Sequence, residues 1–209
     1  MVNCASPALL ARPSVHGLPA PVAKAETEPG EDNSQDASVG TLVHVYLEII
    51  VRSGVAAWTP QRIASLLPMM RRWLAQHGHG AADAAAGALR VERCLNATLA
   101  SEQGRWVLAA RAGAAAELAV TSYERGRIAT RVVDRSFVED GVRWIIDYKT
   151  ASVTDDETAL ARHAEHYREQ LEGYAQLFAA EGLPLRLGVF YAALGRLVEL
   201  PVAAGPSPG

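Results

Sequence analysis

Two strand-like segments joined by a very short turn constrain the fold of this chain more than any other feature. The segments GRIATRVVDRSF (126–137) and VRWIIDYK (142–149) are rich in β-branched and aromatic residues, which favour strands. Glu139-Asp140-Gly141 lies between them, and Gly141 can take the positive φ angle that a hairpin turn requires. The two segments are therefore predicted to pair as an antiparallel hairpin.

Charged side chains interrupt the apolar runs of both predicted strands. Asp147 ends the apolar run of the second strand, and Lys149 follows two residues later. Because side chains alternate between faces along a strand, Asp147 and Lys149 are expected to point the same way. Asp134 ends the apolar run of the first strand in the same manner. A hairpin that closes at Asp140-Gly141 can bring both aspartates to one end of the sheet.

This pattern has two chemical interpretations. Two neighbouring carboxylates repel each other unless a cation lies between them, and a hard, oxygen-preferring ion such as Mg²⁺ meets that need. Lys149 would then supply positive charge for a substrate oxygen. The alternative is a buried ion pair between Asp147 and Lys149, with Asp134 at a solvated strand end. A lone D-x-K pattern favours this alternative.

Further helices and strands are predicted on both sides of the hairpin. Helices are indicated by apolar residues at helical spacing and by Gly and Pro stop signals, and strands by β-branched and aromatic runs. The predicted helices cover residues 41–54, 60–76, 81–101 and 156–181. The additional predicted strands cover residues 117–124, 185–194 and the short segment LVEL. This order predicts an α/β domain in which helices cover a mixed sheet.

The chain divides into three parts by composition. Residues 1–38 mix Pro, Ala, Ser, Glu and Asp without periodicity, so they are expected to form a disordered lead-in. Residues 39–200 are expected to form one domain, with a helical part at 39–104 and an α/β core at 105–200. Residues 201–209 are expected to form a flexible tail.

Composition excludes several classes of protein. No stretch approaches the roughly 18 uninterrupted apolar residues of a membrane helix. The first residues lack the charged region of a secretory signal, and two cysteines cannot form a disulfide framework, a zinc site or an iron–sulfur cluster by themselves. A reducing cytoplasm is therefore the expected location.

The charge distribution permits a phosphate-containing partner without requiring one. The formal net charge is −3, and residues 1–40 carry two basic and five acidic side chains, so the remaining chain is neutral overall. Basic residues gather around the hairpin, at Arg125, Arg127, Arg131, Arg135, Arg143 and Lys149. From charge alone, a solvated hairpin face is the simplest interpretation of this group.

The segment VVDRSFVEDGVRWIIDYKTAS (132–152) resembles the core of the PD-(D/E)XK nuclease superfamily. It resembles more narrowly the C-terminal nuclease domain of UvrD-type helicase–nucleases such as RecB and AddA. Val133-Asp134 matches the first acidic motif of that family. Asp147-Tyr148-Lys149 matches its D-Y-K motif. The resemblance implies a restriction-endonuclease-like core, in which helices flank a central mixed sheet, with extra helices at the N-terminus.

Three further positions extend the resemblance to most of the chain. In the segment YREQLEGY, Gln170 and Tyr174 match the Q-x-x-x-Y helix of the family and lie one turn apart on one helix face. His44 ends the segment GTLVH and matches the family's G-T-x-x-H helix. Glu117 lies where relatives often carry an acidic residue. The order of these motifs makes the resemblance specific.

The resemblance also implies roles for these residues. A divalent metal, Mg²⁺ or Mn²⁺, would be held by His44, Asp134, Asp147 and the backbone carbonyl of Tyr148, with Glu117 as a further candidate ligand. The implied catalytic residues are Asp134, Asp147, Lys149, Gln170 and Tyr174. Lys149 would orient the attacking water or stabilise the transition state. Gln170 would position the lysine or the DNA backbone, and Tyr174 would pack beneath it or touch the strand.

The activity implied is hydrolysis of DNA phosphodiester bonds in repair and recombination, on single-stranded DNA or at duplex ends. Relatives carry a helicase motor, but this sequence has no G-x-x-x-x-G-K-[ST] loop. Two alternatives remain: a helicase subunit acts in trans, or the domain only nicks DNA. The alternative to a nuclease is a catalytically silent DNA-binding or assembly module. Such modules usually lose motif acids or the lysine, whereas this chain keeps them.

Overall fold

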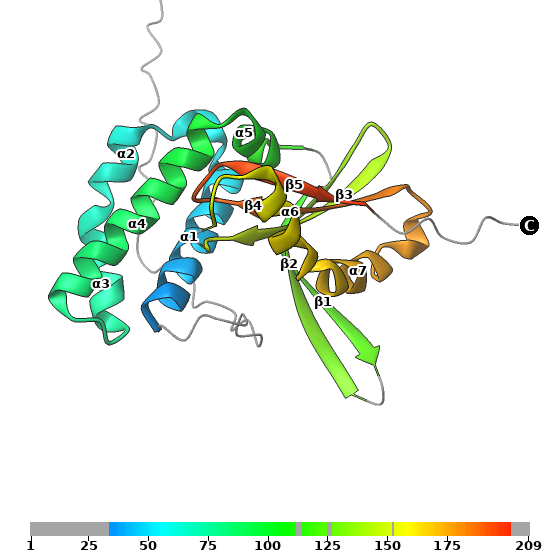
Figure 1. Ribbon diagram of the computed structural model, residues 1–209, viewed down its shortest axis with the longest axis horizontal. Helices are drawn as coiled ribbons and strands as arrows, with labels where there is room; N and C mark the ends of the chain where they lie inside the picture. Colours follow the sequence, from blue (N-terminus) through cyan, green and yellow to red (C-terminus); the bar gives the residue numbers. More distant parts are fainter. Residues whose placement is uncertain (1–33, 112–113, 125–126, 152, 202–209) are drawn as a thin grey trace, which may run out of the picture.

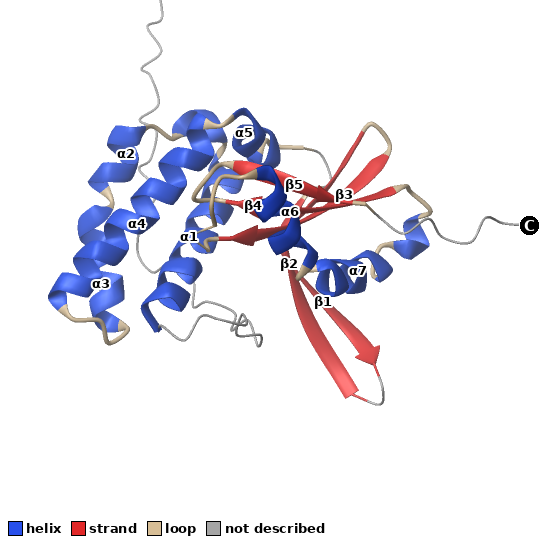
Figure 2. Ribbon diagram, in the orientation of Figure 1, coloured by secondary structure: helices blue, strands red, loops and turns tan. Residues whose placement is uncertain are grey.

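The computed structural model describes residues 34–111, 114–124, 127–151 and 153–201. Its helices and strands form a mixed sheet with helices on both faces (Figures 1 and 2). The helices are α1 (Ser34–Ser53), α2 (Pro60–Ser65), α3 (Leu67–Gln76), α4 (Ala81–Ala100), α5 (Glu102–Leu108), α6 (Glu157–Glu165) and α7 (Arg168–Gln176), with short 3₁₀ helices η1 (Val55–Ala57) and η2 (Ala179–Glu181). The strands are β1 (Ala115–Glu124), β2 (Arg127–Glu139), β3 (Val142–Lys149), β4 (Leu185–Tyr191) and β5 (Arg196–Leu200).

The strands follow the order β1-β2-β3-β4-β5 across a single sheet. Strands β3 and β4 run parallel, and every other neighbouring pair is antiparallel. The parallel pair arises because α6 and α7 carry the chain across one face of the sheet before β4 begins, as parallel strands require a crossover. The predicted α/β fold with a mixed sheet is confirmed.

The hairpin between β2 and β3 closes as predicted. Asp140 and Gly141 both have positive φ angles, 51° and 75°, which is the pattern of a two-residue type I′ turn. The ladder then runs from Glu139 opposite Val142 to Arg135 opposite Ile146. This register fixes which residues of the two strands meet at the far end of the hairpin.

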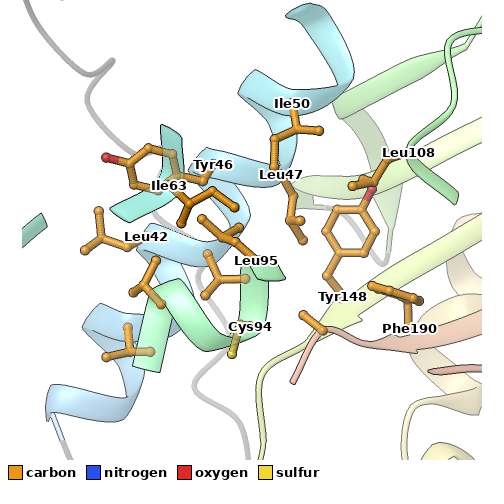
Figure 3. Close-up of a cluster of buried hydrophobic side chains, with 14 of the residues drawn as sticks. Leu42, Tyr46, Leu47, Ile50, Ile63, Cys94, Leu95, Leu108, Tyr148 and Phe190 are labelled. Carbon is orange, nitrogen blue, oxygen red and sulfur yellow. The ribbon is translucent and has the colours of Figure 1, made fainter. Parts of the chain in front are cut away.

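A first hydrophobic core lies between the sheet and helices α1, α4 and α5. Along α1, buried apolar residues recur at a spacing of three and four, which gives the helix a continuous stripe to pack inward. They are Val39, Leu42, Val43, Tyr46, Leu47 and Ile50. Figure 3 shows part of this stripe packed with Leu95 of α4 and facing Tyr148 and Phe190 of the sheet.

A second core lies on the opposite face of the sheet, under α6 and α7. It contains Ile145 of β3 and Leu187 and Val189 of β4, together with Leu160 and Leu171 of the two helices. Strand β3 therefore contributes alternate residues to the two cores, as the period of a strand requires. Its odd-numbered residues, which include the charged ones, face α6 and α7.

Two predicted helices are each divided in the structure. The predicted helix at 60–76 is two helices that meet at Leu66, and Pro68 lies in the first turn of α3. Proline lacks the N–H of a helix interior and clashes with the preceding turn, so it starts a new helix here. The predicted helix at 156–181 is α6, α7 and η2, with the first break at His166 and Tyr167. Gly182 ends this segment with a left-handed φ of 66°, as expected.

The N-terminal boundary also differs from the prediction. Helix α1 begins at Ser34, within the segment expected to be a disordered lead-in. Residues 1–33 and 202–209 of the predicted lead-in and tail lie outside the described residues. Within the described ranges, no helix has the length and apolar character needed to cross a membrane.

Three members of the predicted basic group, Arg135, Arg143 and Lys149, are buried rather than solvated. Arg135 donates from Nε to the Val107 carbonyl at 3.1 Å and from Nη2 to the Ala109 carbonyl at 2.7 Å. Burial lowers the pKa of this guanidinium. Arg143 is also buried and pairs with Glu181. Arg135 therefore anchors β2 to the end of α5 rather than presenting charge to a partner.

Candidate metal and nuclease site

The two motif aspartates lie on neighbouring strands at the end of the β2–β3 ladder. The last ladder pair is Arg135 opposite Ile146, and Asp134 and Asp147 are the next residue on each strand. Their exposed fractions are 3% and 0%. Beyond this point the β1–β2 hairpin extends away from the rest of the sheet (Figure 1). Both carboxylates are therefore buried where the two strands part.

The Asp134 side chain links β2 to β3 just beyond the last residue pair of their ladder. Its Oδ2 accepts a hydrogen bond of 2.7 Å from the backbone N–H of Tyr148, and its Oδ1 lies 3.3 Å from Nδ1 of His44. A carboxylate that accepts a buried backbone N–H is fixed in orientation and stabilised as the charged form. The expectation that Asp134 would occupy a solvated strand end, one half of the ion-pair alternative, is wrong.

His44 reaches the sheet from the middle of α1. Its Nε2 lies 3.1 Å from the carbonyl oxygen of Tyr148, and its ring meets the Tyr148 ring edge-on, with centroids 5.7 Å apart. Gly40, one turn earlier, also lies close to the end of β3: a Cβ there would lie 3.3 Å from Oγ1 of Thr150, a tight contact. Helix α1 therefore packs closely against the end of β3 and places His44 beside Asp134.

Asp147 and Lys149 form an ion pair on the face of the sheet that α6 and α7 cover. Lys149 Nζ lies 3.1 Å from Asp147 Oδ2, and both side chains are almost fully buried. The ion pair of the alternative interpretation is therefore present. Asp147 immediately precedes Tyr148, whose backbone N–H binds Asp134 and whose carbonyl contacts His44.

Gln170 and Tyr174 lie on α7, which packs against β3 and β4. Gln170 Nε2 donates a 2.8 Å hydrogen bond to the Tyr174 hydroxyl. Tyr174 is buried in the second core, and Gln170 is half-buried. The two residues predicted to share a helix face do so, and they contact each other directly.

Only the backbone position of Glu117 is described. It lies on β1 between Ala116, which pairs with Arg135, and Leu118, which pairs with Val133. The register therefore sets the Glu117 position next to that of Asp134. Its side chain lies outside the described residues.

Sequence reasoning missed three aromatic or imidazole side chains near the ion pair. The Nδ1 of His163 lies 2.9 Å from the hydroxyl of Tyr191. Tyr191 is the β4 neighbour of Lys149 in the parallel ladder. The ring of Tyr167 lies under the Lys149 ammonium, with Nζ 3.9 Å from the ring centroid. The alternation of β4 could have indicated Tyr191, because Val189 and Tyr191 share the face of Lys149.

The electrostatics of these groups agree with their positions. Burial lowers the pKa of His163, and the positive charges of His166 and Lys149 lower it further. Burial raises the pKa of the Tyr191 hydroxyl, and the charge of Asp147 adds to that effect. Both residues therefore experience the field of the Asp147–Lys149 pair.

The donor atoms at this end of the sheet fit a hard divalent cation. Two carboxylates, one imidazole and the carbonyl of Tyr148 are the oxygen-rich mixture that Mg²⁺ and Mn²⁺ accept. Among the residues that the structure describes, no three His, Cys, Asp or Glu side chains are close enough to form a metal cluster. His44 and Asp134 are in contact, while Asp147 is held against Lys149.

Comparison with known proteins supports the family that the motifs and the geometry suggest. No curated protein sequence matches this chain at a significant level. The family model described as the PD-(D/E)XK nuclease superfamily matches residues 15–204, which is most of the chain. The match includes α1 with His44, the hairpin with both aspartates and Lys149, and α7. With that match and the mixed sheet flanked by helices, the chain belongs to the PD-(D/E)XK nuclease superfamily.

Proposed function

We propose that this chain is a metal-dependent nuclease that hydrolyses DNA phosphodiester bonds at the Asp134–Asp147 end of the sheet. The observation that carries the proposal is that two buried carboxylates and the buried Lys149 lie at one end of a sheet, with the partly buried His44 beside Asp134, in a chain of a nuclease superfamily. Burying so many charged groups is costly for stability alone. A reaction that uses them accounts for that cost.

His44, Asp134, Asp147 and the carbonyl of Tyr148 are the proposed metal ligands, with Glu117 as a further candidate. A bound Mg²⁺ or Mn²⁺ would supply a Lewis acid for the scissile phosphate and a water of lowered pKa. Asp134 is already oriented by the Tyr148 N–H, and His44 is held between Asp134 and the Tyr148 carbonyl. His44 thus contacts two other proposed ligands, Asp134 and the Tyr148 carbonyl.

Lys149 is the proposed electrostatic catalyst. Its ammonium lies beside Asp147, so it stays close to the position where the scissile phosphate would bind, and it can stabilise negative charge that develops on a phosphoryl oxygen. Gln170 and Tyr174 form a hydrogen-bonded pair on α7, which covers the same face of the sheet. We infer that this pair positions Lys149 or the DNA backbone.

The order of the motifs supports a narrower proposal, a nuclease domain of the RecB and AddA type that acts in DNA repair and recombination. The structure places His44 on a helix before the sheet, the aspartates on the hairpin and Gln170 on the crossover helix. A helicase that acts in trans is the proposed partner, and single-stranded DNA or a duplex end is the proposed substrate. Contacts to phosphate would give little dependence on base sequence.

A second candidate function is a silent DNA-binding or assembly module. The observation that favours it is the Asp147–Lys149 ion pair, which holds one proposed metal ligand against the proposed catalytic lysine. In a silent module, this pair would persist in the presence of divalent metal. In an active nuclease, metal binding would compete with Lys149 for the Asp147 carboxylate.

One set of cleavage assays separates these functions. Purified protein is incubated with linear and circular single-stranded DNA and with linear duplex, in Mg²⁺, Mn²⁺, Ca²⁺ or EDTA, with and without ATP. We expect cleavage in Mg²⁺ or Mn²⁺, none in EDTA, binding without cleavage in Ca²⁺, and no effect of ATP. An Asp134→Asn, Asp147→Asn double variant, purified in parallel, measures contaminating nuclease.

Each result has a definite meaning. Undiminished cleavage in EDTA contradicts the metal mechanism, and equal cleavage by the double variant assigns the activity to a contaminant. DNA binding without cleavage in any metal supports the silent module. Cleavage of circular single-stranded DNA would show that a free end is not required.

A further inference from the structure

The Lys149 ammonium has an aromatic neighbour in addition to its carboxylate. Tyr167 lies at the junction of α6 and α7 and is buried, and the centre of its ring is 3.9 Å from Lys149 Nζ. An ammonium this close to a ring face is attracted by the negative charge density of that face, and the attraction is strongest where water is excluded. Tyr167 lies outside the motif residues Gln170 and Tyr174.

The ring restricts a side chain that is otherwise flexible. Lysine carries a compact charge on a four-carbon stem with several rotatable bonds, so a single carboxylate partner leaves it several conformations. Asp147 is on the same strand and the same face, which means that it approaches the ammonium from one side only. The Tyr167 ring closes a second side and leaves the ammonium fewer positions.

The Tyr167 ring is itself held by contacts from α6 and β4. The His163 ring, one helical turn earlier, meets it at an interplanar angle of 60° with centroids 5.4 Å apart. His163 Nδ1 lies 2.9 Å from the Tyr191 hydroxyl, and that hydroxyl lies 3.4 Å from the carbonyl oxygen of Leu160. Tyr191 in turn neighbours Lys149 in the ladder. The rings of His163, Tyr167 and Tyr191 therefore contact one another and lie next to Lys149.

On this geometry we propose that Tyr167 is a positioning residue: the face of its ring holds the Lys149 ammonium beside Asp147, and His163, bonded to Tyr191, holds the ring in place. This rests on the proposed nuclease function for its effect on turnover. The placement of the lysine can be tested separately. It also gives a role to the break between α6 and α7, since that break turns Tyr167 toward the sheet.

Nuclear magnetic resonance can test the placement directly, because the chain has only two lysines, Lys24 and Lys149. Protein labelled with ¹³C at the lysine ε-carbon gives two signals, and Lys149→Met assigns them. A methylene near a ring face resonates upfield. We expect the Lys149 ε-protons to lie upfield of those of Lys24, to return toward the ordinary position in Tyr167→Leu, and to remain upfield in Tyr167→Phe.

Turnover provides the second measurement. Tyr167→Leu is expected to lower kcat roughly 10- to 100-fold with KM within about threefold, because a misplaced catalytic group costs rate rather than binding. Tyr167→Phe keeps the ring face and should retain at least about a third of wild-type kcat. His163→Ala keeps the Tyr167 ring but removes its edge contact. For that variant we expect a partial loss of the upfield shift and a smaller fall in kcat.

Phe178→Leu is the matched control. Phe178 belongs to the same core and lies under a cation, with its ring centroid 4.8 Å from the Arg143 guanidinium, but at the other end of β3. It should lower the melting temperature about as much as Tyr167→Leu while leaving both kcat and the Lys149 signal at their wild-type values.

Four results would overturn the proposal. The first is an unchanged Lys149 signal in Tyr167→Leu. The second and third are a loss of kcat in Tyr167→Phe, or in Phe178→Leu, as large as the loss of kcat in Tyr167→Leu. The fourth applies if Tyr167→Leu does not fold, and it is a wild-type Lys149 signal in His163→Ala. If the wild-type protein cuts no DNA in any metal, the nuclease function fails. The lysine signals still decide whether Tyr167 positions Lys149.

Discussion

The two ends of strand β3 carry the same kind of assembly in different surroundings. Arg143 and Lys149 lie on the same face of the strand, each over an aromatic ring and each beside a carboxylate. At the first end, Arg143 donates two hydrogen bonds to Glu181, of 2.9 and 2.7 Å, and lies over Phe178. The Glu181 side chain is 35% exposed, so water shares the solvation of that carboxylate.

At the other end, water contributes almost nothing. Asp147 is fully buried, its Oδ2 lies 3.1 Å from Lys149 Nζ, and Asp134 is the next residue beyond the ladder on the neighbouring strand. A planar guanidinium with a bidentate partner is a geometry suited to holding a fold. A lysine ammonium is a compact charge on a flexible stem, which suits it less to fixing a fold and more to presenting charge.

The difference teaches that similar ion pairs can serve different purposes in one sheet. Removing two charges from water costs several kcal/mol per ion, and a buried pair is often no more stable than apolar residues of the same volume. The Arg143 pair avoids part of that cost, because water reaches Glu181 at this end of β3. The buried Lys149 pair does not avoid it, which agrees with its proposed role in a functional site.

The largest effect is expected for Asp147→Ala. It removes a proposed metal ligand and the partner of Lys149, so cleavage should fall at least about a thousandfold, and Ca²⁺ binding measured by calorimetry should weaken strongly. Glu181→Ala makes the same change at the other end of β3 and should leave cleavage within about twofold. An Asp147→Ala protein that still cuts DNA at a measurable fraction of wild-type rate would remove the distinction between the two ends.

Lys149→Ala should lower cleavage by roughly two to three orders of magnitude, because it removes an electrostatic donor to the transition state. DNA affinity should stay within a few-fold, since ground-state binding depends on many phosphate contacts. Gel-shift titrations in Ca²⁺ and single-turnover rates in Mg²⁺ measure the two quantities.

The same variant tests the ion-pair interpretation through stability. Loss of Lys149 leaves a buried carboxylate uncompensated, which costs about 3–5 kcal/mol of unfolding free energy if the pair is purely structural. If Asp147 is a metal ligand, Ca²⁺ should restore much of the lost stability in a melting experiment. Early unfolding that Ca²⁺ does not reverse, in a protein whose wild type cuts no DNA, would make the pair a structural salt bridge.

Arg143→Met is expected to affect stability and not activity. It keeps an apolar stem over Phe178 but removes two charge-assisted hydrogen bonds, so the free energy of unfolding should fall by about 1–3 kcal/mol. Cleavage per folded molecule should remain within about twofold. Urea unfolding and single-turnover rates check the two statements. A tenfold loss of rate at unchanged stability would place the Arg143 end in the site.

The smallest effect is expected for Glu181→Gln. The amide can still accept from Arg143, and the side chain is partly solvated, so the stability change should be below about 1 kcal/mol with unchanged cleavage. Asp147→Asn is its counterpart in the buried pair and should abolish cleavage. Glu181→Gln and Asp147→Asn hardly change the side-chain volume, so thermal melts and cleavage rates of these two variants compare the two ends of β3.

Much of the fold could be predicted from local patterns. The alternation of apolar residues and the Asp140-Gly141 turn identified the hairpin and its register, because strand period and turn stereochemistry act over a few residues. The helix breaks could not be predicted in the same way. The apolar periodicity continues through Leu66 and Tyr167, and only Pro68 gave a signal.

The residues of the candidate site could be proposed from the sequence, but their contacts could not. The sequence indicated His44, the hairpin acids and Lys149, and the fold places them at one end of the sheet. It gave no indication that Asp134 would accept from the Tyr148 N–H or that His163 would bond to Tyr191. Glu117 stays a prediction, since its side chain lies outside the described residues.

By itself, the sequence determined what is local: the faces of β3, the turn at Asp140-Gly141, the apolar stripe of α1 and the order of the motifs. Only the tertiary structure decided which groups meet. His44 and the Tyr148 carbonyl are 104 residues apart in the chain and 3.1 Å apart in space. The physical reason is that periodicity reports which face of an element is buried, whereas a contact between distant segments depends on how those faces pack.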